Sequence, residues 1–383
     1  MWFRSFLIAF VALVVTCLLG CQGQGKQSAP ALSPASGEVL YVVDNVGVTT
    51  YAVDPDTLAP SLVGGSVGLI PPSSFLLQFV PSPDDHSLYV LWSDAQQQEH
   101  LSAYATDSSG VPQTPPLQTL NVSSLSQLNI HPSGKFAYGM QVDSSNGAYV
   151  SKIVLFHIKV SGMLNRDPDV QGIYGPATFP TLLYGVSPDG SQIYLASEDA
   201  NGPAYWESAV NEQNGTLAPD NLLFRPPVRD SAVLGATLAI EYQNFLDYSG
   251  PGYVNVLSNE PEPPQQLIHC ASAMLSACGT ASNVQIDPSG QYLFLTDPAS
   301  GQVRVGLIDF PANAIADTGN FLPFTAQTPG FAFSPDGTLV YAWLASDRSL
   351  HIYRFDRTSG NLTDGGTSID LPTSSGFLPA LRQ

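Results

Sequence analysis

From Gly37 onward, short runs of alternating apolar and polar residues are separated by turns rich in Gly, Pro, Asp and Ser. Alternation with a period of two predicts half-buried β-strands. The clearest copies are a Ser-Pro-Asp-Gly turn and the apolar strand after it, at 187–197 (SPDGSQIYLAS) and 334–346 (SPDGTLVYAWLAS). No long stretch has the period of a helix, so the pattern indicates an all-β fold.

This turn-and-strand unit recurs seven times. Related copies stand at 82–94, 131–140 and 287–297, a partial copy begins at 37, and a degraded copy spans 249–259. Alignment on the aromatic position of the strand gives Tyr41, Tyr89, Tyr138, Tyr194, Val254, Phe294 and Tyr341. The spacing of 40 to 60 residues matches one blade of a β-propeller, which has four antiparallel strands.

A second half of the unit is another alternating strand that ends in an Asp- or Asn-containing turn, as in 351–363. Such turns supply positive φ where the chain reverses. First strands of six blades are predicted near 75–81, 126–131, 180–187, 233–241, 281–287 and 329–334. The first blade lacks one, and we expect 375–381 to supply it by pairing with 39–43. That pairing would close a seven-bladed ring and leave no open sheet edge.

The N-terminus predicts export. Arg4 precedes an apolar run of fourteen residues, 6–19, which is too short to span a bilayer comfortably and suits a signal peptide. The run ends in Leu-Leu-Gly-Cys, which resembles the bacterial lipobox. The resemblance implies cleavage before Cys21 and acylation of that residue, although ordinary secretory cleavage and an uncleaved anchor remain alternatives. Gln22 after the lipid site resembles lipoproteins of the outer membrane in diderm bacteria.

The resulting division is a signal peptide at 1–20, a flexible tether at 21–36 and a propeller at 37–383. Two cysteines then remain in the exported domain, Cys270 and Cys278. An even pair in an exported protein favours a disulfide, with two free thiols as the alternative.

The charge of the chain excludes one class of function, the binding of nucleic acid. Acidic residues number 32 against 13 basic ones, and the net charge is −19. A nucleic-acid-binding protein needs a basic stripe, which this chain lacks. The net charge instead favours solubility of an exported protein.

Candidate chemistry gathers in the loops that border the channel of a propeller. Arg225 and Arg229 lie before the fifth blade and could clamp a carboxylate or phosphate, or simply pair with nearby acids. Glu241 lies on the first strand predicted for that blade, and His269 follows the predicted loop between its second and third strands. A histidine there can act as an acid or base near neutral pH, although a lone histidine beside a disulfide is more often structural.

Other polar residues are better explained as structural. Asp54 with Asp56, and Asn165 with Asp167 and Asp169, are spaced like Ca²⁺ ligands but read as ordinary turn residues in the region between third and fourth strands. His131 occupies a turn position that is Ser or Asp in sister blades. We therefore predict no metal site and no cofactor.

The Ser-Pro-Asp-Gly turns, the apolar-Tyr strands and the Tyr/Phe-x-x-Asp-x-x-Ser/Thr-Gly-x-Leu segments resemble the lactonase-type propellers, the family of bacterial 6-phosphogluconolactonase and its YVTN-repeat relatives. The resemblance covers about 340 residues, 37–381. It implies a seven-bladed propeller and allows hydrolysis of a sugar lactone, but no catalytic residue of the family can be matched to a numbered position.

The sequence therefore favours a binding or scaffold module, anchored through its lipid, with a small molecule, carbohydrate or protein on its loop face. The first alternative is a lactonase-like hydrolase of a sugar lactone, and the second is a partner in cell-envelope assembly. Whether the protein is an enzyme stays open at this stage.

Overall fold

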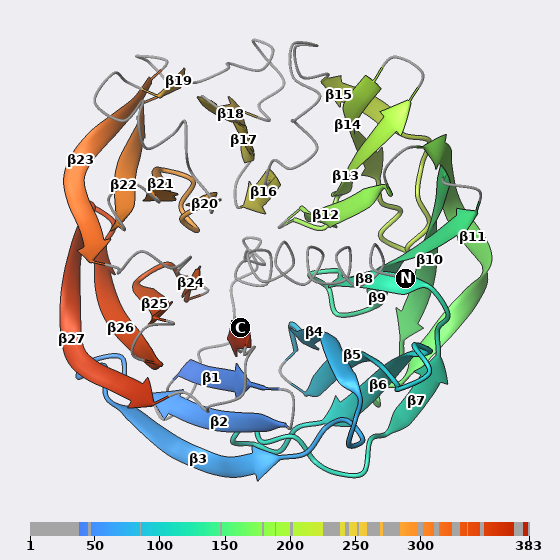
Figure 1. Cartoon of the computed structure of the whole chain (residues 1–383), viewed down its shortest axis with the longest axis horizontal. Helices are drawn as coiled ribbons and strands as arrows, with labels where there is room; N and C mark the ends of the chain where they lie inside the picture. The colour runs from blue at the N-terminus through green and yellow to red at the C-terminus, as the bar shows by residue number, and fades with distance from the viewer. Residues whose placement is uncertain are drawn as a thin grey trace.

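The computed structural model is an all-β propeller whose sheets are arranged around a central axis (Figure 1). It describes residues 38–44, 47–84, 86–145, 148–177, 180–187, 189–199, 202–224, 238–241, 245–250, 253–258, 269–270, 284–297, 302–309, 314–323, 330–334, 336–344, 348–370 and 378–381. Within these ranges no helix is long and apolar enough to cross a membrane.

The first four blades follow the predicted order of four antiparallel strands. The first blade contains β1 (Glu38–Val43), β2 (Val48–Val53), β3 (Pro60–Val67) and the C-terminal β28 (Leu378–Leu381). The second contains β4 (Phe75–Pro81), β5 (Ser87–Ser93), β6 (Glu99–Ala105) and β7 (Gln118–Asn121). The third contains β8 (Leu125–Ile130), β9 (Phe136–Ser145), β10 (Ala148–Ile158) and β11 (Leu164–Ala177). The fourth contains β12 (Leu182–Val186), β13 (Gln192–Asp199), β14 (Gly202–Ala209) and β15 (Asn221–Phe224).

Three more sheets follow along the chain. One sheet contains β16 (Leu238–Glu241), β17 (Phe245–Gly250) and β18 (Tyr253–Ser258). The next contains β20 (Val284–Ile286), β21 (Tyr292–Asp297), β22 (Gln302–Asp309) and β23 (Ala314–Pro323), with β19 (His269–Cys270) outside β23. The final sheet contains β24 (Gly330–Phe333), β25 (Leu339–Leu344), β26 (Ser349–Asp356) and β27 (Asn361–Asp370). Six sheets thus have a complete blade of four strands or more, and the β16–β18 sheet has three strands in the described residues.

The C-terminal strand closes the ring as predicted. β28 pairs antiparallel with β1, with Leu381 opposite Leu40 and Leu378 opposite Val43. The inner edge of the first blade therefore comes from the end of the chain, and the rest of that blade comes from the beginning.

Two expectations need correction in the less regular part of the ring. The segment aligned on Val254 was interpreted as a second strand, but it is the third strand, β18, and the second strand is β17. The reason is that Gly250 pairs with Tyr253 to close the hairpin between β17 and β18, whereas the sequence alignment equated this Gly-Pro-Gly stretch with a turn before the second strand. The sheet that holds β19 also departs from the antiparallel rule, because β19 pairs with β23 in parallel.

In the first three blades, the tyrosine that defines the repeat links its blade to the next. The Tyr41 hydroxyl donates to the carbonyl oxygen of Gly110 at 2.8 Å, and the Tyr138 hydroxyl donates to that of Gly215 at 2.8 Å. Tyr89 makes the same bond to Gly162 at 3.0 Å. Each acceptor lies in the turn between the third and fourth strands of the following blade.

Glycine is needed at these acceptor positions for two reasons. Gly162 and Gly215 have φ of +82° and +76°, which L-residues with a Cβ rarely adopt. A Cβ on Gly215 would also lie 2.7 Å from the Phe136 ring. The turns of one blade can therefore approach the second strand of the preceding blade closely enough to accept the tyrosine hydroxyl.

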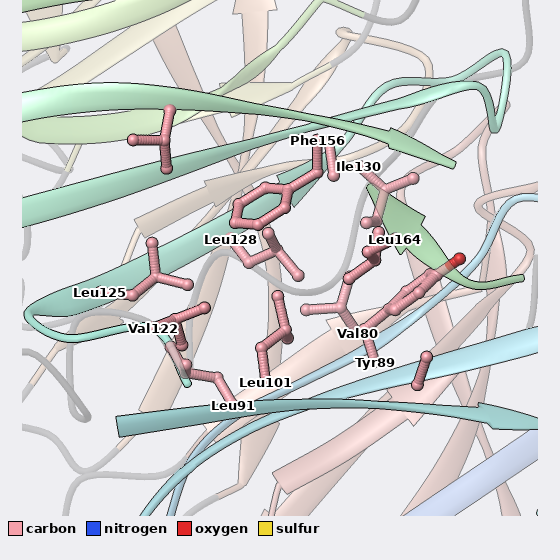
Figure 2. Close-up of a cluster of buried hydrophobic side chains, with 13 residues drawn as sticks. Val80, Tyr89, Leu91, Leu101, Val122, Leu125, Leu128, Ile130, Phe156 and Leu164 are labelled. Carbon is pink, nitrogen blue, oxygen red and sulfur yellow. The ribbon is translucent and has the colours of Figure 1, made fainter. Parts of the chain in front are cut away.

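Apolar side chains fill the wedges between neighbouring blades. Between the second and third blades, Tyr89, Leu101, Leu128 and Phe156 belong to one cluster of buried side chains, all 1% exposed or less (Figure 2). The equivalent cluster between the last and first blades joins Leu40 to Tyr341. Burial of this kind contributes on the order of 2 kcal/mol per large side chain, so the ring is held mainly by contacts between consecutive sheets.

His131 adds a polar link between the third and fourth blades. Its Nε2–H donates to the carbonyl oxygen of Gly190 at 2.9 Å, and its Nδ1 accepts the backbone N–H of Ser133 at 3.1 Å. Acceptance at Nδ1 requires a neutral imidazole, and burial lowers the pKa of His131 below its ordinary value of 6.5. The structural interpretation of this histidine therefore fits its contacts.

The ring has two distinct faces. The turn face carries the turns between first and second strands and between third and fourth strands, such as 82–87 and 159–163. The loop face carries the hairpins between second and third strands, such as 94–98, and the connections between blades, such as 122–124.

The hydroxyl link at Tyr138 is expected to stabilise the ring measurably. Tyr138→Phe leaves the buried Gly215 carbonyl without that donor, so we expect a loss of about 1–3 kcal/mol in the free energy of unfolding. Urea denaturation followed by tryptophan fluorescence measures it. Tyr149→Phe, at a partly exposed tyrosine of the same blade, is the matched control; an equal loss in both variants would contradict the assignment.

The His131 contacts predict an acid-sensitive ring. Because its folded-state pKa lies below the unfolded value, unfolding takes up a proton, and stability falls as pH drops through 6.5 toward the folded-state pKa. His131→Ser, which restores the residue of sister turns, should lose less thermal stability between pH 7.5 and 5 than the parent does. An equal loss of melting temperature in the two proteins between pH 7.5 and 5 would contradict this account.

Candidate functional site

The channel is surrounded by the innermost strand of each sheet, and amide side chains join these strands to one another. Gln78 on β4 makes two bonds to the next blade: its Nε2 donates to the Leu128 carbonyl at 2.8 Å, and its Oε1 accepts the Leu128 N–H at 2.7 Å. Gln78 is 4% exposed. Its side chain therefore replaces a missing strand partner for Leu128.

The same arrangement recurs around the ring. Gln127 on β8 accepts the N–H of Leu183 on β12 at 2.9 Å, and Asn129 donates to the Leu183 carbonyl at 3.4 Å. Gln285 on β20 donates to the carbonyl of Phe331 on β24 at 3.1 Å. We call Gln78, Gln127, Asn129 and Gln285 the amide belt.

The amide belt has a clear physical cause. An innermost strand has a hydrogen-bonded neighbour on its outer side only, so its inner backbone groups need other partners. The belt satisfies part of that demand. Its side chains therefore serve the scaffold by joining consecutive innermost strands.

The loop face of the second blade carries an aspartate–histidine pair. His100 Nε2 lies 3.1 Å from Asp94 Oδ2, and its ring stacks on Trp92 with centroids 4.2 Å apart. Trp92 Nε1 in turn donates to Ser102 Oγ at 3.0 Å. Backbone N–H donation from Gln98, and secondarily His100, lowers the pKa of Asp94, so this carboxylate is ionised at neutral pH.

Polar contacts continue from this pair onto the third blade. Glu99 Oε2 accepts the N–H of Ser124 at 3.0 Å, and Gln98 Nε2 donates to Ser123 Oγ at 3.0 Å. Beyond them, Lys152 Nζ donates to Asp143 Oδ2 at 3.0 Å. We call Asp94, Gln98, Glu99, His100, Asp143 and Lys152 the loop-face polar cluster.

The position of this cluster limits its chemistry. Asp94 follows a second strand, and His100 belongs to β6, a third strand, so the pair lies radially outside the innermost strand β4. The side chains of the cluster can bind a polar ligand on the loop face. They do not converge on the channel with the amide belt, and in the described residues no group of three or more His, Cys, Asp or Glu side chains is arranged to hold a metal ion.

Most site residues expected from the sequence fall outside the described residues. Arg225, Arg229, Cys21 and Cys278 belong to that group. For Glu241, His269 and Cys270 only the backbone is described.

The two described backbones occupy different places in the ring. Glu241 ends β16, an innermost strand, at the turn face, where it pairs with Phe245. His269 begins β19, which pairs with β23 at the outer end of its sheet (Figure 1). The strands that carry these two residues therefore lie at opposite radial ends of neighbouring sheets.

The residues spaced like Ca²⁺ ligands make ordinary hydrogen bonds within the protein. Asp54 Oδ1 accepts the N–H groups of Asp56 and Thr57, as expected of a turn aspartate. The placement of 165–169 in a turn is wrong, because these residues belong to β11. There a register shift opposite 154–156 leaves Asp167 Oδ2 3.2 Å from His157 Nε2.

The amide belt and the Asp94–His100 pair were missed by the sequence analysis. A glutamine within the first strand was visible in LQFV, SQLNI and NVQI, but amides at these positions carry no signal that distinguishes a scaffold role from a surface position. Asp94 could have been recognised as a hairpin residue, whereas the return of His100 onto it depends on strand register.

Comparison with solved structures shows what the fold resembles. The periplasmic gluconolactonase PpgL of Pseudomonas aeruginosa superimposes with a TM-score of 0.62 at 15% identity, covering 90% of this chain and 99% of that one. A candidate 6-phosphogluconolactonase of Bacteroides uniformis gives 0.61 at 15% identity, covering 90% and 99%. A candidate 6-phosphogluconolactonase of Bacteroides fragilis gives 0.60 at 18% identity, covering 91% and 98%.

These structural neighbours support the lactonase-type propeller that the repeat resembles. At such identities the likeness concerns the fold. No protein-family model and no curated protein matches the sequence.

Removal of one belt amide should weaken the inner ring locally. Gln78→Leu keeps the volume but leaves both backbone groups of Leu128 unpaired, so we expect a loss of about 2–3 kcal/mol and faster amide exchange at Leu128. Hydrogen exchange with mass spectrometry measures the local effect. Gln96→Leu, on an exposed hairpin, is the control; unchanged exchange at Leu128 in the Gln78 variant would refute the role of the belt.

Proposed function

We propose that this protein is a lactonase-type hydrolase of a sugar lactone, held at the cell envelope by a lipid. The observation that carries the proposal is the match over 98–99% of the length of three propellers described as lactonases or candidate lactonases. The sequence repeat independently resembles the same family. The fold alone does not define an activity, so the assay below carries the test.

The reaction would need few groups. Water adds to the lactone carbonyl carbon, the bond from that carbon to the ring oxygen breaks, and the ring oxygen takes up a proton to give a hydroxy acid. A base must accept a proton from the attacking water, and a cation or N–H donor must stabilise the oxyanion. We assign the base to Glu241 or His269 and the cationic group to Arg225 or Arg229.

The proposed location follows from the N-terminal signal. Acylation of Cys21 after removal of residues 1–20 would anchor the protein outside the cytoplasm, and Gln22 favours the outer membrane of a diderm cell. The Pseudomonas neighbour is described as a periplasmic gluconolactonase, which supports an extracytoplasmic location. In such a compartment Cys270 and Cys278 would form a disulfide.

We further propose that 37–383 form one seven-bladed domain, with the β16–β18 sheet as the fifth blade. Its support is the position of β16, which contacts the innermost strands β12 and β20 on either side. A fourth strand of that blade would complete the circuit.

A binding module is the second candidate. It is favoured by the amide belt, because these amides on the innermost strands are bonded to backbone groups of the next blade. A module of this kind would use the loop-face polar cluster to hold a carbohydrate or other polar ligand without turnover.

The assay uses full-length protein purified in detergent, with glucono-1,5-lactone and its 6-phosphate as separate substrates. Proton release is followed at pH 6.5. After subtraction of the spontaneous rate, hydrolysis by an enzyme should give kcat/KM on the order of 10⁴ M⁻¹ s⁻¹. At least one of Glu241→Gln and His269→Gln should lower kcat about 100-fold.

The matched control is His100→Gln, which alters a histidine of the loop-face polar cluster outside the proposed acid–base set. It should retain the parental rate. Absence of hydrolysis above the spontaneous rate with both substrates would reject the enzyme, and binding of either lactone without turnover in calorimetry would then favour the binding module.

A further inference from the structure

The direction of the first strand fixes where the N-terminal segment meets the ring. β1 begins at Glu38, which pairs with Val53 immediately before the turn that starts at Asp54. The other end of β1 leads into the hairpin closed by the bond from Asp44 N–H to the Gly47 carbonyl. Glu38 therefore lies on the turn face, and the chain leaves the ring from that face.

The C-terminal strand leads to the same face. In β28 the residue nearest the C-terminus, Leu381, pairs with Leu40 near the start of β1, whereas Leu378 pairs with Val43 near its end. Both chain ends thus reach the ring at the turn face, and the loop face carries neither.

From this geometry we infer that the protein presents its loop face away from the bilayer and its turn face toward it. The inference rests on the lipid anchor of the proposed function, but not on lactonase activity. It assigns the loop-face polar cluster, and any ligand site in the loops around the channel, to partners that arrive from the aqueous side.

The length of the connecting segment makes the orientation measurable. Sixteen residues, 22–37, separate the proposed lipid site from β1. They span at most about 55 Å when fully extended, and about 22 Å on average for a flexible chain. The strands of a blade extend roughly 20–25 Å between the two faces. The two faces of the ring therefore differ in their distance from the lipid by about the average length of the tether.

The charge of the turn face keeps that face from contacting the lipid headgroups directly. Its exposed carboxylates outnumber its exposed basic residues in the described turns. The acidic residues are Asp54, Asp56, Asp84, Asp107, Asp189, Glu212, Asp336 and Asp356, and the basic ones are Lys135, Lys159, Arg354 and Arg357. Repulsion from anionic headgroups acts within about 8 Å at physiological ionic strength. The ring is thus held near the bilayer by its tether, with the turn face standing off the headgroups.

The first arm of the test establishes the anchor. Cells that express the full chain are labelled with a tagged fatty acid: Cys21→Ser should lose the label, and Cys17→Ser, inside the signal peptide, should keep it. Label retained in Cys21→Ser would remove the anchor and the orientation with it, while leaving the lactonase assay unaffected.

The second arm measures orientation in the acylated protein. A donor fluorophore is placed at Val160→Cys, on a fully exposed turn-face residue, or at Gln96→Cys, on an exposed loop-face hairpin. Each protein is inserted into phosphatidylcholine vesicles that contain acceptor-labelled headgroups, and the chain without an added cysteine provides the blank. Energy transfer should be at least twofold more efficient from position 160 than from position 96. Equal transfer, or greater transfer from position 96, would overturn the inference.

Discussion

The ring depends on apolar packing between consecutive sheets, and at three junctions a second-strand tyrosine also donates a hydrogen bond to a turn carbonyl of the following blade. Tyr41, Tyr89 and Tyr138 make this bond. All three contacts point in the same direction around the axis, so the second, third and fourth blades are each tied to the preceding blade. These contacts also explain two sequence features together, because the tyrosine and the glycine that accepts its bond belong to different repeats and are meaningful only as a pair.

A second constraint acts at the axis. Every innermost strand has one edge without a strand neighbour, and the amide belt supplies some of the missing partners. The four belt amides therefore serve the scaffold, because each is bonded to a backbone group of the next blade. The residues to test for catalysis are therefore those outside the belt, namely Arg225, Arg229, Glu241 and His269.

Much of the architecture was predictable because it depends on local chemistry. Ser-Pro-Asp-Gly turns announce the start of a second strand, and the first strand at 75–81 and the closure by β28 were placed correctly. The fifth sheet was misaligned because Gly250 and Tyr253 close a different hairpin from the one their composition suggested. The Asp94–His100 pair could not be foreseen, since it depends on which residues register brings side by side. His269 shows the same limit, because the pairing of β19 with a strand of the next sheet is a long-range choice.

The pairing of β28 with β1 has a mechanical consequence for a protein tethered at its N-terminus. Tension that enters at Glu38 runs along β1, which has a bonded neighbour on each side, β28 and β2. Load along the strand direction is shared by the bonds of both ladders at once, and they do not open one after another. A strand held on one edge would peel; this one must slide past two neighbours. The pairing of β28 with β1 thus lies where a pull from the membrane would act, and its hydrogen bonds would be loaded in shear.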